Sequence, residues 1–238
     1  MPSLKLPSDQ QHILLIGKNG SGKTRAAVWH LAQKDLQHEQ WFVINHKREE
    51  MINSIPGAVF MGMDKVPPKG KAGVYIYTPK PGADDSAVDA ILGYVYDTEN
   101  IGTYIDEGYM ISPRSSQLNS LYTQGRSKHC PVITLSQRPA YISRLAVSEA
   151  TFFQVFNLID RRDRKLIGEF LPCDLERLMV PINGQPRLLK DYHSVYFDTR
   201  GNDAIIALPV PDDETILEIF AEKLRPKSEI PVGKLKML

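Results

Sequence analysis

Residues 17–24 contain the spacing of a phosphate-binding loop, G-x-x-x-x-G-K-S/T. Glycines in such a loop let backbone N–H groups turn toward phosphate oxygens, and the start of the following helix adds a positive dipole end. Lys23 would reach the β- and γ-phosphates, and Thr24 would hold a magnesium ion. The sequence therefore predicts a site for ATP and Mg²⁺. Its nucleotide-binding residues are expected to be Gly17, Lys18, Asn19, Gly20, Ser21, Gly22, Lys23, Thr24 and Arg25.

The segments on either side of this loop have the patterns that the motif requires. His12–Ile16 is an apolar run typical of a buried strand, and Thr24–Gln37 carries apolar residues at helical spacing. A Gly-rich turn before a helix can also occur by chance. The strand–loop–helix context favours the nucleotide site over that alternative.

A second candidate motif places two acids, Asp106 and Glu107, at the end of the apolar segment Thr103–Asp106. Asp106 would join the magnesium shell beside Thr24, and Glu107 would orient and deprotonate an attacking water. A pair of exposed acids at a strand end is the alternative, and the phosphate loop upstream favours the catalytic role. A small-molecule kinase activates a substrate hydroxyl instead, so it would have less use for Glu107.

A third candidate is Gln137, which follows the apolar run Val132–Ser136 and precedes Arg138-Pro139. If that strand lies next to the phosphate-loop strand, its terminal polar residue lies near the γ-phosphate. The amide of Gln137 could then sense this phosphate or hold the attacking water. The alternative is a glutamine that caps a strand before a proline turn.

Strand-like and helical segments alternate over most of the chain, which predicts an α/β fold with a mostly parallel central sheet and helices on both faces. Residues 53–72, rich in Pro and Gly, are expected to form a long surface connection. The expected strands are His12–Ile16, Trp41–Asn45, Gly73–Tyr77, Thr103–Asp106, Val132–Ser136 and Phe152–Phe156. The expected helices include Thr24–Gln37, Asp84–Tyr96 and Ser115–Ser127.

The last quarter of the chain has a different character. Tyr192–Phe197 and Ala204–Leu208 are short strand candidates joined by a polar loop, which predicts a C-terminal β-hairpin. Asp212–Arg225 follows as a helix whose acidic start and basic end suit its dipole. We expect one domain over residues 1–238, with a core at about 10–170, a hairpin and helix extension at about 185–225, and a loosely held tail at 226–238.

The composition excludes several classes of protein. The net charge of the 238 residues is +1, so any DNA contact must come from a local patch or from one face of an oligomer. Two cysteines are too few for a disulfide framework or a zinc site, and they suggest a reducing compartment. No segment has the length of a membrane span, and the first residues lack the apolar stretch of a secretion signal.

The run Leu121–His129 and the strand end Ser136–Pro139 resemble the FtsK/HerA superfamily of ring-shaped DNA pumps. In that family, a helix carries an arginine and a following strand ends in Thr-Gln-Arg-Pro or a similar sequence. Here Ser136 stands in the place of the threonine. Phe152–Asn157 and Asp163-Arg164 resemble the next strand and helix start. The likeness covers residues 10–170 and implies a RecA-like P-loop NTPase fold of the additional-strand catalytic glutamate (ASCE) class.

By this resemblance, Arg126 is the candidate arginine finger that reaches the γ-phosphate held by a neighbouring subunit. Such an arginine neutralises charge that develops during phosphoryl transfer. The alternative is a solvated arginine at a helix end. Arg138 and Arg144 are further candidates for the same role. We thus expect the catalytic residues to be Glu107, Lys23, Arg126 and Gln137, and the metal-binding residues to be Thr24 and Asp106.

Two other polar segments remain open in the sequence. Asn45–Arg48 follows the second strand and is either a sensor or base-contact region or, more simply, a solvated loop. Asp160–Lys165 is either a helix start capped by Asp160, with a solvated basic face, or a basic patch that lines a DNA channel.

A motor core of 26.8 kDa without further domains resembles the genome-packaging ATPases of tailless icosahedral viruses with an internal membrane. The resemblance implies a homo-oligomeric ring, for which we expect a hexamer, that drives double-stranded DNA without sequence preference. Its partners would be capsid-vertex or membrane proteins of a virion, and its location the virion vertex or the host cytoplasm. Alternatives are a filamentous-phage assembly ATPase, a HerA- or FtsK-like cellular translocase and, less consistent with the motifs, a nucleotide kinase.

Overall fold

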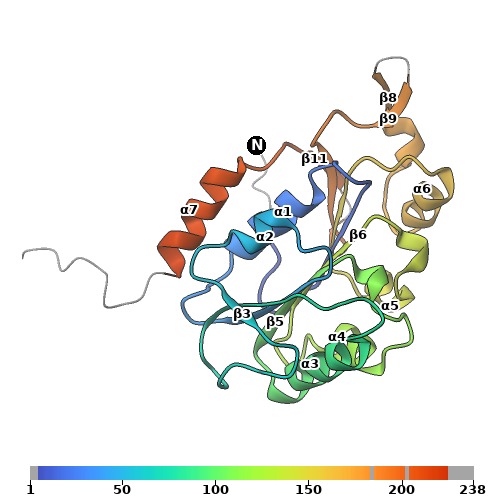
Figure 1. Cartoon of the computed structure of the whole chain (residues 1–238). Coiled ribbons are helices and arrows are strands. Elements are labelled where there is room, and N and C mark those ends of the chain that lie inside the picture. Colours follow the sequence, from blue (N-terminus) through green and yellow to red (C-terminus); the bar gives the residue numbers. More distant parts are fainter. Residues whose placement is uncertain (1–4, 183–184, 202–203, 225–238) are drawn as a thin grey trace, which may run out of the picture.

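The structure, a computed structural model, describes residues 5–182, 185–201 and 204–224. The chain folds as three layers, with a central sheet between two layers of helices (Figure 1). The predicted tail at 226–238 lies outside the described residues. None of the helices in the described ranges is both long and apolar enough to cross a bilayer.

The described residues form a nine-stranded sheet in the order β11-β10-β7-β1-β6-β5-β2-β4-β3. Strands β3 to β7, β1 and β2 run parallel, as the α/β pattern predicted. The phosphate-loop strand β1 lies between β6 and β7, and β6 separates it from β5. The strands are β1 (Ile13–Ile16), β2 (Gln40–Asn45), β3 (Val59–Met61), β4 (Gly73–Tyr77), β5 (Ile101–Asp106), β6 (Val132–Ser136), β7 (Phe152–Val155), β10 (Ser194–Asp198) and β11 (Ala204–Ala207).

The helices divide between the two faces because side chains alternate along each buried strand. Leu14 and Ile16 belong to the same buried cluster as residues of α3 to α6, whereas Ile13 and Leu15 belong to the cluster formed with α1, α2 and α7. Both faces of the parallel strands are therefore buried. The helices are α1 (Lys23–Ala32), α2 (Glu50–Asn53), α3 (Asp85–Thr98), α4 (Ser116–Gln124), α5 (Arg144–Ser148), α6 (Arg161–Gly168) and α7 (Asp213–Lys223), with the short 3₁₀ segments η1 (Gly108–Met110), η2 (Pro139–Tyr141) and η3 (Leu175–Leu178).

The parallel register brings the candidate catalytic segments to one edge of the sheet. Ile16 at the end of β1 is level with Ser136 at the end of β6, and Asp106 at the end of β5 is level with Asn45 at the end of β2. The chain leaves each of these strands at its carboxyl end. The phosphate loop, Glu107 and Gln137 consequently start from the same edge.

The surface connection predicted at 53–72 contains one strand that the sequence did not indicate. Val59–Met61 forms β3, the edge strand of the sheet, and pairs in parallel with β4. Val59 and Phe60 are exposed at 46% and 57%. A three-residue strand between Pro and Gly residues leaves too short a pattern for period-two alternation to be recognised.

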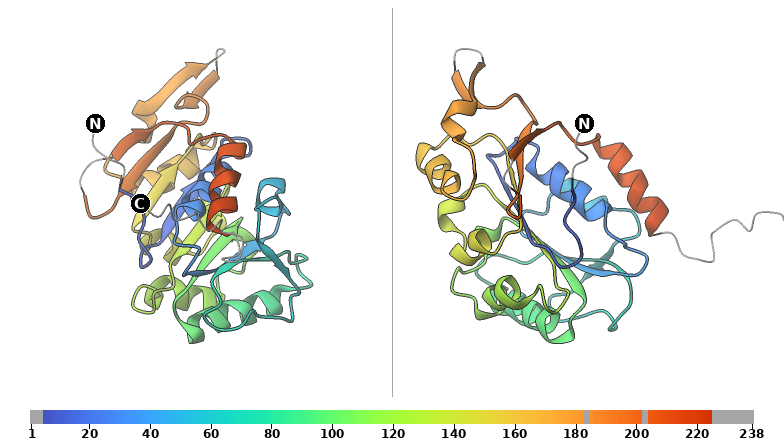
Figure 2. Two further views of the ribbon diagram at one scale, coloured as in Figure 1. Left: turned by 90° about the vertical axis from the view of Figure 1, so that its left-hand side faces the viewer. Right: turned by 180° about the vertical axis from the view of Figure 1, so that it is seen from behind.

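The predicted C-terminal hairpin and helix are both present, and they extend the core. Strand β10 pairs antiparallel with β7 and with β11, so the hairpin adds two strands to the sheet. Helix α7 lies beside α1 on the same face of the sheet (Figure 2). Lys223 donates to the carbonyl oxygens of Ala32 (2.6 Å) and Lys34 (2.8 Å), at the C-terminal end of α1. A second hairpin, β8 (Met179–Ile182) with β9 (Gln185–Leu188), lies outside the main sheet.

Two buried histidines should make stability depend on pH. Burial lowers the pKa of His12 and of His30 from 6.5 to about 4. The unfolded chain binds more protons than the folded chain between these values, so stability falls as the pH falls through this window. Asp106 opposes this trend. Burial raises its pKa to about 6, so below that pH the folded chain binds more protons at this group than the unfolded chain, and stability rises as the pH falls.

We expect urea denaturation at about pH 7, 6 and 5 to show a decrease of roughly 1 kcal/mol in unfolding free energy per pH unit. That figure is the contribution of His12 and His30 to the change in unfolding free energy, reduced by the opposite contribution of Asp106. The decrease should be steeper in Asp106→Asn, because this variant removes the opposing group. A free energy of unfolding that does not change between pH 7 and about 5 would contradict the assignment of neutral buried histidines.

Candidate functional site

The phosphate loop is held at the carboxyl ends of the two strands that flank β1. The Gly17 N–H donates to the Ser136 carbonyl oxygen (3.2 Å), and the Lys18 N–H donates to the Asn157 carbonyl oxygen (2.9 Å). Gly20 and Gly22 have φ values of 71° and 91°, in the left-handed region that favours glycine. The sequence pattern thus corresponds to a loop whose shape requires its glycines.

A cavity of about 270 Å³ lies over this loop. The predicted binding residues from Lys18 to Arg25 line it, which places them together as expected. Four further residues come from outside the motif, and the sequence did not indicate them as part of the site. They are Glu49, Met51, Tyr192 and Asp213.

Glu107 is the point at which the candidate catalytic groups meet. Its side chain is fully buried, and its backbone has a φ of 56°, a left-handed conformation unusual for glutamate. Its Oε1 accepts from Lys23 Nζ at 3.3 Å and from Lys47 Nζ. Its Oε2 accepts from the Gln137 backbone N–H at 3.2 Å. A carboxylate held by two ammonium groups and one amide has one orientation, as a general base requires.

Asp106 lies beside this cluster, and its carboxylate has no hydrogen-bond partner among the described residues. Its side chain is fully buried, and neither carboxylate oxygen accepts a hydrogen bond from any described residue. Burial raises its pKa to about 6, the neighbouring Glu107 adds to this, and Lys23 opposes it. A buried carboxylate without a partner is costly unless a cation offsets it, so its two free oxygens suit a magnesium ion or its bound water.

Gln137 lies where the sequence predicted, immediately after β6 and next to the phosphate-loop strand. Its side-chain amide nitrogen donates to the Tyr109 hydroxyl at 3.2 Å. Tyr109 belongs to η1, the turn that directly follows Glu107. The side chain and backbone of Gln137 therefore connect the ends of β5 and β6. The exposed Arg138 follows Gln137, and η2 begins directly after it.

The segment Asn45–Arg48, left open in the sequence, has two separate roles. The fully buried Asn45 is structural, since its Oδ1 accepts from the Glu49 N–H at 3.0 Å and its Nδ2 donates to Asn53 Oδ1 at 3.0 Å. Lys47, in contrast, belongs to the site through its ion pair with Glu107. Burial lowers the pKa of Lys47, but the hydrogen bond and charge of Glu107 outweigh this and raise it.

Arg126 lies at the amino ends of the strands, whereas the phosphate loop lies at their carboxyl ends. It follows α4 and its charge acts on His12, which precedes β1. The four residues of β1 separate the two ends by roughly 13 Å. Arg126 is exposed and forms no ion pair with any residue that the structure describes. Its guanidinium thus lies away from the nucleotide site of its own chain.

The turn that carries Arg126 is sterically fixed by Gly125. A Cβ atom at Gly125 would lie 2.2 Å from the Leu121 carbonyl oxygen and 2.8 Å from that of Cys130. The Cys130 N–H also donates to the Gly125 carbonyl oxygen at 2.8 Å. A larger residue at position 125 would therefore displace the turn that precedes Arg126.

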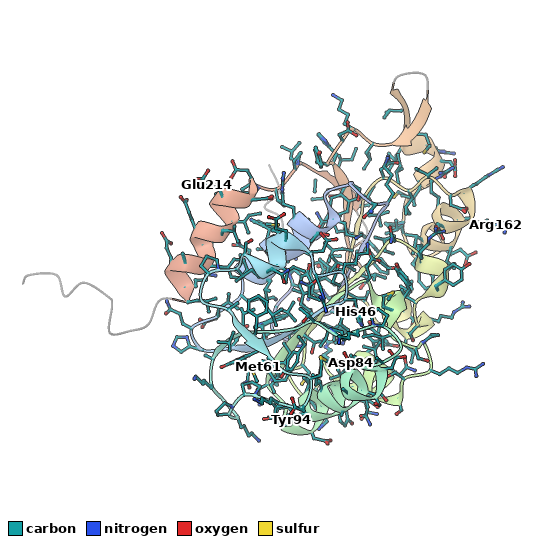
Figure 3. The ribbon with its side chains drawn as sticks, in the orientation of Figure 1. His46, Met61, Asp84, Tyr94, Arg162 and Glu214 are labelled. Atoms are coloured by element: carbon teal, nitrogen blue, oxygen red, sulfur yellow. The ribbon has the colours of Figure 1, made fainter. Side chains whose placement is uncertain are left out.

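The basic cluster at Asp160–Lys165 is partly structural. Asp160 caps α6 as predicted, since it accepts from the Arg162 N–H at 2.7 Å. Arg164 is buried and donates to the carbonyl oxygens of Leu158 (2.9 Å) and Ile159 (2.6 Å), so its placement on a solvated face was wrong. Arg162 is exposed and points outward from α6 (Figure 3).

The sequence was also compared with known proteins. No protein-family model matches it. It is 47% identical over 219 residues to the DNA packaging ATPase P9 of Enterobacteria phage PRD1, a match that covers 92% of this chain and 95% of that protein. The chain belongs to this family of DNA packaging ATPases. The predicted resemblance to viral genome-packaging ATPases is thereby confirmed.

Solved structures agree with the packaging ATPase family in fold. The genome packaging NTPase B204 from Sulfolobus turreted icosahedral virus 2, in complex with ATP-γS, matches with a TM-score of 0.65 and 15% identity. That match covers 86% of this chain and 100% of the other. EssC (ATPases 2 and 3) from Geobacillus thermodenitrificans matches with a TM-score of 0.55 and 14% identity, over 90% of this chain and 43% of the other. The predicted P-loop NTPase fold is confirmed.

Proposed function

We propose that this packaging ATPase hydrolyses ATP to move double-stranded DNA into a viral capsid. The observation that carries the proposal is the buried Glu107, held by Lys23, Lys47 and the Gln137 N–H at the edge from which the phosphate loop starts. This arrangement supplies a water-activating carboxylate beside a phosphate cradle. The family membership adds the DNA substrate.

ATP would change the partners within this cluster. The γ-phosphate competes with Glu107 for Lys23, because both are anions and only one can lie within hydrogen-bond distance of each ammonium proton. Lys47 and the Gln137 N–H would then keep Glu107 oriented toward the attacking water. Gln137, joined to Tyr109, would transmit the loss of the γ-phosphate to η2 and the residues that follow it.

Thr24 and Asp106 are the residues that would hold Mg²⁺. The two unpartnered oxygens of Asp106 are the feature of this structure that fits a cation. A bound magnesium ion would neutralise charge on the β- and γ-phosphate oxygens. Lys23 opposes the rise in the pKa of Asp106 and so favours the ionised carboxylate that a cation would bind.

The active form would be a homo-oligomeric ring, for which we propose six subunits. Arg126 lies at the sheet edge opposite to its own phosphate loop, so it could reach a nucleotide only in a neighbouring copy. A head-to-tail contact of this kind closes into a ring when its rotation allows. Residues 1–238 would act as one ATPase unit, placed at a virion vertex or in the host cytoplasm by capsid or membrane proteins.

Duplex DNA should stimulate ATP hydrolysis, and the stimulation should decrease with salt. Contacts to the phosphate backbone release counterions, so the DNA concentration for half-maximal stimulation should rise steeply between about 50 and 200 mM NaCl. The exposed Arg161 and Arg162 are candidates for such contacts, and replacing both with Gln should reduce the salt slope by about 2. A coupled ATPase assay with duplexes of unrelated sequence measures this. Stimulation that depends on DNA sequence, or that does not respond to salt, would contradict backbone tracking.

A further inference from the structure

The extension after residue 185 contributes a side chain to the nucleotide cavity. Tyr192 precedes β10, and its ring packs directly on the phosphate loop at Gly22. A Cβ atom at Gly22 would lie 2.9 Å from Tyr192 Cδ1, so any larger residue there would displace the ring. Gly22 is thus required both by its φ of 91° and by the approach of this ring.

The side chains around Tyr192 come from the start of α1 and the start of α7. The Arg25 guanidinium lies 6.0 Å from the centroid of the Tyr192 ring. Its Nε donates to Asp213 Oδ1 at 2.5 Å. Arg25, Tyr192 and Asp213 all line the cavity that contains the phosphate loop. Helix α7 is therefore joined to α1 at both ends, by Asp213 on Arg25 and by Lys223 on Ala32.

The position of this group relative to the loop indicates what it would contact. The loop amides and Lys23 take the phosphates, so the nucleoside must occupy a part of the cavity beyond them. Tyr192 has an accessible aromatic ring in this cavity, with 51% of the residue exposed although it packs on Gly22. An aromatic face with one free side is a stacking surface for any nucleobase. A neighbouring guanidinium adds a second flat, cationic contact.

We propose that the base of the bound nucleotide stacks on Tyr192, with Arg25 held beside it by Asp213. This inference rests on the proposed nucleotide site and adds its base-binding part, which the C-terminal extension supplies. Tyr192 has a φ of 63°, a left-handed conformation that is uncommon for tyrosine. Such a conformation persists where the surrounding structure favours it, here with the ring against Gly22.

The matched ligands ADP and inorganic pyrophosphate separate base binding from phosphate binding, because pyrophosphate lacks the adenosine. Isothermal titration of Tyr192→Ala should show ADP binding weakened by about 5- to 150-fold. Pyrophosphate binding should stay within about twofold of the unaltered protein, since stacking acts on the base alone. Tyr192→Phe keeps the ring and should bind ADP as the unaltered protein does. An equal loss for ADP and pyrophosphate would mean that Tyr192 only supports the loop, and would overturn the inference.

A second variant tests stacking without removing the ring. In Tyr192→Trp, ADP should quench the added indole fluorescence and pyrophosphate should not; a response to neither or to both would count against stacking. The outcome for the proposed function is read separately. If the unaltered protein binds neither ligand, the nucleotide site itself fails. If it binds both, and Tyr192→Ala binds ADP with unchanged affinity, only the base-stacking inference fails.

Discussion

Replacing Glu107 with glutamine is expected to lower kcat for ATP hydrolysis by about 10²- to 10⁴-fold, the range for loss of a general base. The change keeps the shape of the side chain and removes the carboxylate that we propose as the activator of water. ATP binding should not weaken, because Lys23 no longer has a carboxylate partner that competes with the γ-phosphate. Single-turnover hydrolysis and a binding titration on the same sample measure the two effects.

The control for this prediction is Glu50→Gln, which neutralises an exposed acid at the start of α2. It should hydrolyse ATP at the unaltered rate. If Glu107→Gln turns over at the rate of this control, Glu107 is not the base. If it instead fails to bind ATP, its role is to hold the phosphate loop through Lys23.

Replacing Arg126 with alanine is expected to have the other large effect. Loss of an arginine finger lowers kcat by about 10³- to 10⁵-fold in enzymes that use one. The free energy of unfolding should change little, because the side chain is exposed and makes no ion pair within the described residues. Comparison of ATPase rates with urea denaturation separates the catalytic from the structural effect. Arg138→Ala and Arg144→Ala serve as comparisons at two other exposed arginines.

Mixing two inactive chains tests whether Arg126 acts across a subunit boundary. A Lys23→Ala chain lacks the phosphate contact but keeps its finger, and an Arg126→Ala chain has the reverse defect. In rings of equal composition, about a quarter of the boundaries would join an intact loop to an intact finger. The mixture should therefore recover up to about a quarter of the normal rate if the sites act independently. No recovery at any ratio would count against a shared site.

The motif-bearing parts of the site could be predicted from the sequence because each follows a strongly apolar parallel strand. In the structure, the register of β1, β5 and β6 brings Gly17, Glu107 and Gln137 to the carboxyl ends of these strands. The C-terminal hairpin and α7 were also predicted, because their signals are local. These signals are the two short strand-like segments joined by a polar loop, and Asp212 at the start of the helix.

The contacts that were missed depend on tertiary packing. Lys47 lies in a polar loop, and only the pairing of β2 with β5 brings its ammonium group to Glu107. Tyr192 was assigned to the start of a strand, whereas β10 begins at Ser194 and Tyr192 turns onto Gly22. Arg164 has the sequence pattern of a solvated face, yet it satisfies buried carbonyl groups. No local pattern encodes these long-range contacts.

Displacement of a third strand from a DNA triplex measures duplex translocation directly. With a triplex at the end of a linear duplex, the unaltered protein should release the third strand in an ATP-dependent reaction, and duplexes of unrelated sequence should serve equally well. The Glu107→Gln protein should bind the same DNA and release nothing. Release by Glu107→Gln, or no release by an unaltered protein that hydrolyses ATP rapidly on this DNA, would contradict a motor driven by this site.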